Sequence, residues 1–525
     1  MLLDRRSLLV GAPAALVGFA GAHSSRALAL SPDKAAVSVR RFGAKGDGTH
    51  IDTPAINRAI EHVARRGGGT VWFPAGTYAS YTIRLASRVT LHLDNGATIL
   101  AAAPPVDGRG GYDLAEPNPF DMYQDFGHSH WHNSLILGEG LHDIAIEGQG
   151  LIWGRGLGRG DGKDDWLKDP SGPGTGNKAI ALKNCRNVTI RDVRMLEGGW
   201  FAILATGVDN LTIDNVLCDT NRDGFDIDCC RNVRVSNCTV NAPYDDAICP
   251  KSSYALGEAR VTENVAISNC LVTGNYQVGS VLDGSWKPMP TEFAPLTHGR
   301  IKFGTETNGG FRNIAVTNCI FQDSRGLAFQ TVDGGIVEDV VVSNITMRGV
   351  INAPIFLRLG RRMRGPAGRP VGSMRRISIR NVTSSGANQL PSVIAGLADH
   401  PIEDLSLSDM FLHHVGGAPA SMAALLPPEN ELAYPEAPMF GDLPATGLYA
   451  RHVRGLTMSN VEVAVARPDP RAAFALADVT DADVSRVRVP AGAAAFQLRD
   501  VRGFRHSGSR AVPDRVVAGP ASLSF

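Results

Sequence analysis

The sequence carries no net charge: its 525 residues include 52 lysines and arginines against 52 aspartates and glutamates. Charged residues make up only 20% of the chain. A protein that binds nucleic acid through phosphate contacts needs a basic surface, and a net charge of zero disfavours one. We therefore expect no nucleic-acid partner. A site for an acidic ligand would have to rely on local cations.

Cysteine is absent before residue 185, and all eight cysteines lie between residues 185 and 319. Their spacing does not match a zinc site, because the adjacent Cys229 and Cys230 would chelate poorly. An exported protein could form disulfides. Three cysteines instead follow an asparagine at the same place in a repeated phrase, namely Cys238, Cys270 and Cys319. This pattern predicts buried free thiols, stacked one per repeat and acting as small apolar residues.

A long hydrophobic run is also missing. The apolar stretch that follows Arg5-Arg6 ends near residue 22 and is too short and too rich in glycine and alanine for a membrane span. Paired arginines before a mildly apolar core, then Ala27-Leu28-Ala29, are typical of a twin-arginine signal peptide over residues 1–29. We expect export to the periplasm or the medium and no membrane partner. An uncleaved anchor is the alternative.

A short strand phrase recurs through the chain. It reads NVTIRDVRM from Asn187, NLTIDNVLC from Asn210 and NVRVSNCTV from Asn232, at intervals of 23 and 22 residues, and later copies begin at Asn264 and Asn313. A period of this size, with alternating β-branched residues between Asn, Gly or Asp, is typical of a β-solenoid. The longer later intervals indicate loops inserted between coils, which often build the binding face.

The repeat favours one long domain, because each coil buries its apolar side only against its neighbours. We expect the N-terminal cap and first coils in residues 36–103 and the rest of the β-helix in residues 104–525. The inserted loops are expected at residues 104–133, 155–178, 274–298 and 413–450.

A helix is predicted to cover the N-terminal end of the solenoid. Asp52 or Thr53 can cap it, Pro54 suits its first turn, and Ile56 and Ile60 belong to its apolar stripe. Such a cover is needed because unpaired strand edges invite aggregation.

Three aspartates recur with the repeat: Asp223 precedes the pair Asp245-Asp246 by about one period. Residues one period apart lie on adjacent coils, roughly 4.8 Å apart, so Asp223 should lie directly below the pair. Crowded carboxylates raise the pKa of one group and leave another ionised, which provides a general acid and a general base. The alternative is that these aspartates are turn residues at the corners of coils.

His128, His130 and His132 alternate along the chain and would share one face of a strand, which raises the possibility of a metal site. No cysteine or carboxylate nearby completes such a site, and we expect neither a metal nor a cofactor. A sugar-binding rim formed with Trp131, or plain burial, are the alternatives.

The opening from residue 39, with FGAKGDG and GGGTVWFPAGTY, resembles the start of many pectin-acting right-handed parallel β-helix proteins. NRDGFD, a DD pair and an HG pair then follow in order, and together they resemble glycoside hydrolase family 28, the polygalacturonases and rhamnogalacturonan hydrolases. The similarity extends to about residue 380. It implies an all-β, single-stranded right-handed parallel β-helix with an N-terminal helical cap. It also implies hydrolysis of α-glycosidic bonds in pectic polysaccharide, with inversion.

Carried over position by position, the resemblance makes Asp245 the general acid and lets Asp223 and Asp246 activate water. His298 would support the acid or orient the sugar. The residues expected around the substrate are Asn221, Asp226, Lys251, Arg300, Lys302 and Glu306. If Asp223 and Asp245 lie on adjacent coils, the distance between their carboxyl groups is near the short value of retaining enzymes, whereas the family is inverting. The sequence therefore leaves the stereochemistry open.

The chain departs from the family's motifs at several positions. Arg222 replaces the threonine of Asn-Thr-Asp, Tyr244 precedes the DD pair, and Ala328 and Gln330 stand where Arg and Lys belong. In the family, these cations hold a galacturonate carboxylate, and a hydrogen bond to a charged group is worth roughly 1.5–3 kcal/mol. Their loss suggests a neutral neighbour such as rhamnose, or a carboxylate held by the cations of residues 300–302.

The expected partner is an acidic plant cell-wall polysaccharide or its oligosaccharides. We expect the protein to be a monomer. Loops that carry Trp131 and Trp286 could close one end of the cleft. We therefore expect attack from chain ends, with release of mono- or disaccharides.

Two other functions fit the same fold. A calcium-dependent pectate or rhamnogalacturonan lyase could use Asp223, Asp226 and Asp228 as ligands. The sequence has no dedicated motif for the Arg or Lys base that a lyase needs. The second alternative is a glycan-binding β-helix without enzymatic activity.

Overall fold

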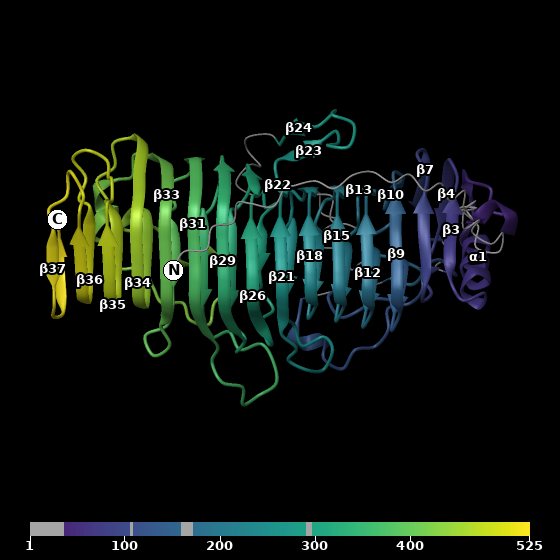
Figure 1. Cartoon of the computed structure of the whole chain (residues 1–525), viewed down its shortest axis with the longest axis horizontal. Helices are drawn as coiled ribbons and strands as arrows, with labels where there is room; N and C mark the ends of the chain where they lie inside the picture. Colours follow the sequence, from purple (N-terminus) through teal and green to yellow (C-terminus); the bar gives the residue numbers. More distant parts are fainter. Residues whose placement is uncertain (1–35, 106–108, 126, 159–171, 290–296) are drawn as a thin grey trace, which may run out of the picture. The chain divides into compact units, whose positions relative to one another are not determined.

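The computed structural model describes residues 36–105, 109–125, 127–158, 172–289 and 297–525. The predicted signal peptide lies outside the described residues. From Ala36 to Phe525 the chain is one compact unit, in which coils follow one another in chain order (Figure 1). No helix among the described residues is long and apolar enough to cross a membrane.

Most coils contribute one short strand to each of three parallel stacks, in which each strand pairs with the equivalent strand of the next coil. The first stack contains β5 (Ile83–Arg84), β8 (Ser134–Glu139), β11 (Lys178–Lys183), β14 (Phe201–Thr206), β17 (Asp223–Asp228), β20 (Ile248–Lys251), β25 (Ile301–Phe303), β28 (Leu327–Thr331), β30 (Ile355–Leu359) and β32 (Ser392–Ala395). The second contains β1 (Val37–Ser38), β3 (Gly69–Phe73), β6 (Val89–Leu93), β9 (His142–Gly148), β12 (Arg186–Arg191), β15 (Asp209–Asp214), β18 (Arg231–Ser236), β21 (Thr262–Ser268) and β26 (Gly310–Thr317). The third contains β2 (Asp47–Ile51), β4 (Gly76–Ser80), β7 (Ala97–Ala101), β10 (Leu151–Trp153), β13 (Arg194–Leu196), β16 (Leu217–Asp219), β19 (Thr239–Asn241), β22 (Leu271–Thr273) and β27 (Ile320–Gln322).

Toward the C-terminus the strands lengthen and run through more than one stack. They are β29 (Ile336–Arg348), β31 (Ser373–Ala387), β33 (Ile402–Gly416), β34 (Ala445–Arg467), β35 (Ala472–Ser485) and β36 (Phe496–Ser507). Two antiparallel strands, β37 (Arg515–Val517) and β38 (Ala521–Ser524), pair with β36 and cover this end. The predicted all-β parallel solenoid is confirmed.

The predicted helical cap is α1 (Thr53–Arg65), and it is the only α-helix among the described residues. Pro54 lies in its first turn, and Ile56 and Ile60 are buried. The expected side-chain cap is wrong in detail. The Asp52 carboxylate accepts hydrogen bonds from the backbone of residues 45 and 46, and Thr53 Oγ1 accepts one from the Tyr81 amide. Both side chains therefore tie the helix to neighbouring loops.

The core consists of apolar ladders with one residue per coil. A ladder in the second stack pairs Val188 with Leu211, then Val233, Val265 and Ile314, and all five side chains are buried. All eight cysteines lie in the described part of the chain and are free and buried, which confirms the predicted stack of thiols.

An asparagine ladder fixes the corner at which each of these strands begins. Its members are Asn187, Asn210, Asn232, Asn264 and Asn313, with positive φ between 56° and 59°. Each side-chain amide donates to the Oδ1 of the previous member, at 2.8 to 3.0 Å. Asparagine tolerates left-handed backbone and supplies both a donor and an acceptor, which explains its recurrence at this corner.

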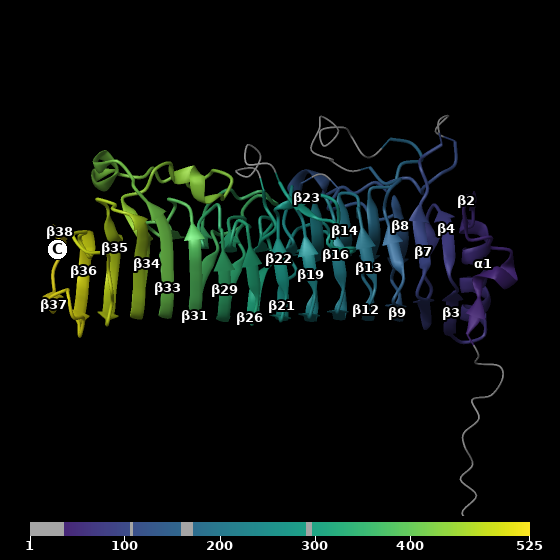
Figure 2. The ribbon, with the colours of Figure 1, turned by 90° about the horizontal axis from the view of Figure 1, so that it is seen from above.

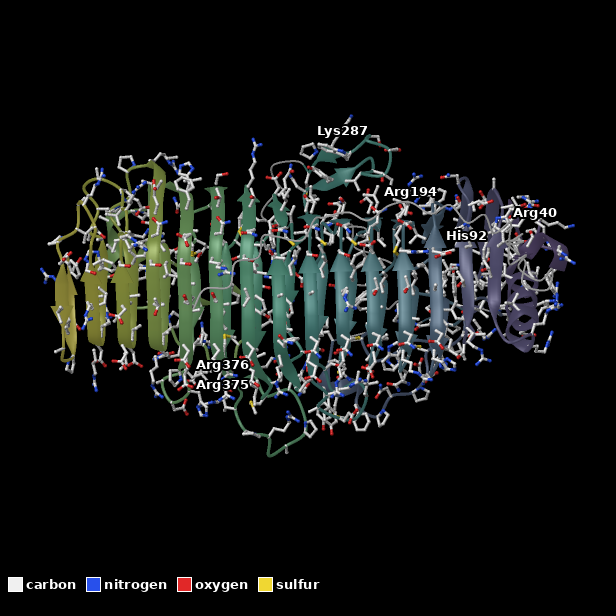
Figure 3. The ribbon with its side chains drawn as sticks, in the orientation of Figure 1. Arg40, His92, Arg194, Lys287, Arg375 and Arg376 are labelled. Atoms are coloured by element: carbon white, nitrogen blue, oxygen red, sulfur yellow. The ribbon has the colours of Figure 1, made fainter. Side chains whose placement is uncertain are left out.

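Two connections leave the coils beside the first stack. The hairpin of β23 (Tyr276–Val278) and β24 (Lys287–Pro288) stands out beyond β22 (Figure 1), with Lys287 at its outer side (Figure 3). The second connection joins β33 to β34 and is called the strap (residues 417–444). It contains the short helices η6 (Ala420–Ala424) and η7 (Ala437–Phe440) and runs back along the coils from β35 toward β29 (Figure 2).

The strap is anchored to the first stack by an apolar contact. Ala437 and Phe440 of the strap belong to one buried cluster with Ala328 of β28, Phe356 of β30 and Val393 of β32. The strap therefore reaches coils that lie far earlier in the sequence.

The ladder generates a prediction about stability. Asn264→Ala removes two ladder bonds and forces a left-handed conformation that alanine disfavours by about 1–2 kcal/mol. We expect Asn264→Ala to lower the urea midpoint clearly, and Asn264→Gly, which adopts the same φ freely, to lower it less. Equal midpoints for the two variants would show that backbone conformation contributes nothing at this corner.

Candidate active site

The predicted aspartates meet at the edge of the first stack. Asp223 begins β17, and Asp245 and Asp246 lie in the loop before β20. The register pairs Phe225 with Ile248, an offset of 23 residues, and the Gly224 amide donates to the Asp246 carbonyl at 2.9 Å. Asp246 is therefore the member of the pair that lies opposite Asp223, on the adjacent coil as the sequence predicts.

The three carboxylates form one cluster. A carboxylate oxygen of Asp246 lies within 4.8 Å of one from Asp223 on one side, and within 4.8 Å of one from Asp245 and a ring nitrogen of His298 on the other. Asp223 is 3% and Asp246 0% exposed, whereas the Asp245 side chain is 22% exposed. Asp245 thus lies at the mouth of the cluster and the other two lie behind it.

Asp223 is the carboxyl that retains its proton most readily. Its Oδ1 is buried and has no hydrogen-bond partner among the described residues. Burial, followed by the negative charges of Asp226 and Asp245, raises its pKa well above the usual range.

Asp245 is held ionised by an arginine. Burial raises its pKa most, but Arg222, with smaller contributions from His298 and Lys302, leaves the pKa of Asp245 below its ordinary value. Arg222 Nη2 donates to Asp245 Oδ2 at 2.7 Å, and its guanidinium lies 4.0 Å from the centre of the Trp200 ring. The arginine that replaces the family's threonine thus has a direct electrostatic effect on the cluster.

Asp246 is the most strongly ionised of the three. Arg300 Nε donates to its Oδ1 at 2.6 Å, and Lys302 Nζ donates to its Oδ2 at 2.7 Å. Burial opposes the charge, but these two cations hold the pKa of Asp246 far below its usual value. Arg300 and Lys302 were expected to hold a substrate carboxylate, but both donate to the carboxylate of Asp246 instead.

A second group of charges lies behind the cluster. Lys251 Nζ is 3.3 Å from Glu306 Oε2 and 4.0 Å from Asp226 Oδ2, and all three side chains are buried. Arg364 donates to the other oxygen of Glu306 at 2.7 Å, and His128 Nε2 lies 3.0 Å from Asp226. These residues are positioned to support the cluster from behind.

His298 and Asn221 lie at the edges of the site. Burial and the nearby Arg325 lower the pKa of His298 to about 4, so its ring is neutral at neutral pH. Its Nδ1 is buried and has no hydrogen-bond partner among the described residues. The Asn221 carbonyl accepts a hydrogen bond from the Tyr244 amide at 2.9 Å, which links the two aspartate-bearing segments.

The strap supplies two site residues that the sequence did not indicate. Glu436 accepts hydrogen bonds from both terminal nitrogens of Arg300, the one from Nη1 at 3.0 Å. The Tyr434 hydroxyl accepts one from Thr305 at 2.9 Å, and Lys302 Nζ lies 5.9 Å from the centre of the Tyr434 ring. No periodic signal marks either residue, because both lie in a loop.

The expectations about the histidine-rich segment were partly wrong. Residues 127–129 form a turn rather than a strand, and the three histidines contact different partners. His130 faces Asp121 and His132 faces Glu139, while His128 joins the site. Trp131 is fully buried, with its indole nitrogen donating to Thr206 at 3.0 Å, so it cannot form a sugar-binding rim.

Three residues of this region could present ligand atoms to a metal ion. His128, Asp223 and Asp226 present ligand atoms within 4.8 Å of one another. Asp228, the third ligand proposed for calcium, instead accepts hydrogen bonds from the amide and hydroxyl of Ser253. One imidazole and two carboxylates do not form the oxygen-rich site that calcium prefers.

Two family models match successive parts of the chain, and known proteins are similar to it. Residues 36–152 match the family model described as rhamnogalacturonase A/epimerase, pectate lyase-like, and residues 173–287 match the right handed beta helix region. A probable polygalacturonase of Vitis vinifera is 23% identical over 344 residues, which cover 61% of this chain and 62% of the relative. An exo-poly-alpha-D-galacturonosidase of Dickeya chrysanthemi is 23% identical over 369 residues, which cover 62% and 57%. The chain thus spans about three fifths of the length of these curated relatives.

Among solved structures, a family 28 exopolygalacturonase of Yersinia enterocolitica aligns with a TM-score of 0.60 at 18% identity, over 87% of this chain and 78% of that one. Fold and comparisons together define a right-handed parallel β-helix protein. More particularly, the chain is a β-helix protein similar to glycoside hydrolase family 28.

The charge distribution generates a pH-dependent prediction for Asp223→Asn. Because the pKa of Asp223 is raised in the folded state, wild-type stability falls as pH rises above the ordinary value, about 3.9. We expect Asp223→Asn to unfold at a higher temperature than wild type at pH 7, and this advantage to vanish below about pH 4. Thermal unfolding across this pH range measures the effect.

Asp246→Asn is the matched control, with the opposite expected sign. The lowered pKa of Asp246 means that its ionised form stabilises the fold above its ordinary pKa. Breaking a buried pair costs about 3–5 kcal/mol, since Arg300 and Lys302 lose their partner. Equal shifts for the two variants would contradict the assigned charges.

Proposed function

We propose that the protein is a glycoside hydrolase that cleaves α-glycosidic bonds in pectic polysaccharide or its oligosaccharides. The observation that carries this proposal is the cluster of three carboxylates whose proton affinities are split by their surroundings. Glycoside hydrolysis needs one protonated and one ionised carboxyl beside the scissile bond. The names of the two curated relatives, a polygalacturonase and a galacturonosidase, support the substrate class.

The proton belongs to the cluster rather than to a single residue. Groups that interact this strongly titrate together, so the one proton that burial favours on Asp223 is shared with the other carboxyls. Asp245 is the member at the mouth, and it is the one that can reach a glycosidic oxygen. We propose that Asp245 delivers the proton, in agreement with the family resemblance.

With the shared proton on Asp245, the two inner carboxylates are both ionised, and we propose that they take a proton from the attacking water. Oxygens of Asp223 and Asp246 within 4.8 Å of each other can bind the same water molecule. Arg300 and Lys302 keep Asp246 ionised, which suits a general base. We propose inversion of the anomeric configuration. The closely spaced carboxylates on adjacent coils, Asp223 and Asp246, would then bind one water molecule together, instead of acting as the acid and the nucleophile of a retaining enzyme. Nuclear magnetic resonance of the first product anomer tests this.

Asp245→Asn tests the acid directly. General acid–base catalysis contributes about 10²–10⁴-fold, and we expect kcat on oligogalacturonides or rhamnogalacturonan oligosaccharides to fall by at least this factor. Asp399→Asn is the matched control, since Asp399 pairs with Arg361 on the surface and should leave kcat unchanged. Hydrolysis by Asp245→Asn at the wild-type rate would remove the assignment. Absorbance of an unsaturated product would indicate a lyase instead.

We further propose attack from chain ends by an exported monomer. The hairpin of β23 and β24 is joined to the coil that precedes the aspartate pair, because Asn241 donates to the Tyr276 carbonyl and Asp219 accepts from Ser280. Trp286 stacks on Tyr276 with ring centres 4.1 Å apart, and it is 40% exposed. Such an aromatic face suits a terminal sugar, and two of the similar proteins are named as exo-acting.

A viscosity assay tests the mode of attack. We expect reducing sugar to be released from pectic polymer while viscosity falls slowly, since each cut removes only one or two sugars. Trp286→Ala should raise KM for long chains if its ring holds the terminal sugar. A steep early fall in viscosity with little reducing sugar would mean internal cleavage and would overturn the proposal.

A further inference from the structure

The strap places a carboxylate where the surrounding cations would bind an acidic sugar. Glu436 is bonded by Arg300 and lies 3.9 Å from Arg325 Nη1. Asn352 Nδ2 donates to it at 3.4 Å. Its side chain is 19% exposed, so it lies at the surface of the site rather than in the core.

The two residues that depart from the family's cation motif, Ala328 and Gln330, both contact the strap. Ala328 packs in the apolar cluster with Ala437 and Phe440. Gln330 Nε2 donates to the Pro435 carbonyl at 2.8 Å, directly beside Glu436. Long cationic side chains at these positions would occupy the volume that the strap fills. The loss of the two cations and the presence of Glu436 are therefore one structural change.

We propose that Glu436 makes the sugar position beside Arg300 selective for a neutral sugar and excludes a uronate. This inference rests on the proposed function and names its substrate class, a pectic chain with a neutral sugar at that position. A uronate carboxylate would have to compete with Glu436 for Arg300, and with Asp246 for Lys302. It would also face two fixed negative charges at short range.

The charge on Glu436 and the aromatic ring of Tyr434 both favour a neutral sugar at this position. Burial raises the pKa of Glu436, but Arg300, with Lys302 and Arg325, outweighs this and holds the pKa below its ordinary value. Tyr434, two residues earlier in the strap, is 48% exposed and presents an aromatic face next to Lys302. An aromatic face packs well against the apolar face of a sugar ring and requires no charge on it.

Binding measured by titration calorimetry tests the proposal without depending on turnover. The probes are trigalacturonate and a tetrasaccharide of alternating rhamnose and galacturonate. We expect wild type to prefer the rhamnose-containing probe. Glu436→Gln should bind trigalacturonate about tenfold more tightly, the scale of one hydrogen bond to a charged group, with little change for the other probe.

Two further variants make the result decisive. Glu436→Asp keeps the charge and should keep the wild-type preference, even if Glu436→Gln loosens the strap. Glu431→Gln is the matched control, because Glu431 is in the same strap but pairs with Arg361 outside the site. Unchanged affinity of Glu436→Gln for trigalacturonate, or a wild-type preference for trigalacturonate, would overturn the inference. Selective binding without hydrolysis of either probe would support it and would reject the proposed function instead.

Discussion

The register between successive coils is the constraint on which the rest of the structure depends. Each coil pairs residue by residue with the next, and the asparagine ladder repeats the same left-handed corner at the start of successive strands of the second stack. Side chains 22 or 23 residues apart are thereby held on adjacent strands, a spacing of roughly 4.8 Å. In the core this repetition stacks aliphatic residues, and at the edge of β17 and β20 it stacks carboxylates. One geometric rule therefore produces both the stability of the fold and the charge crowding of the site.

Charge crowding of this kind destabilises a protein unless cations compensate it. The chain compensates unevenly: Asp246 has two buried cations, Asp245 has Arg222, and Asp223 has no partner for its Oδ1 among the described residues. This unevenness is what separates the proton affinities of three chemically identical groups. A site with three equally paired aspartates would be more stable, but none of its carboxyls would have the raised pKa of Asp223.

The repeated parts of this arrangement could be predicted from the sequence, and the unrepeated parts could not. The strand phrases, the stacked cysteines and the helical cap follow from periodicity and local propensity, and the structure confirms them. Asp223 and the Asp245-Asp246 pair could be placed together because they recur with the coils, whereas His298 was predicted only from the family resemblance. The strand expected at the alternating histidines was wrong because alternation within a loop does not imply a strand, and of the alternatives for Trp131 plain burial is the one observed.

Glu436 could not be predicted from the repeat, since it lies in a loop and its partner Arg300 is 136 residues away in the sequence. What the sequence did reveal was the other half of the contact: the motif cations missing at Ala328 and Gln330. Those absences implied a change in what binds beside the carboxylate cluster, but not its cause. The strap provides the cause, because a loop that packs on a small residue and a neutral amide brings its own carboxylate to Arg300. A solenoid can change specificity in this way while its coils stay intact, because a loop inserted between two late strands can reach a site built by earlier ones.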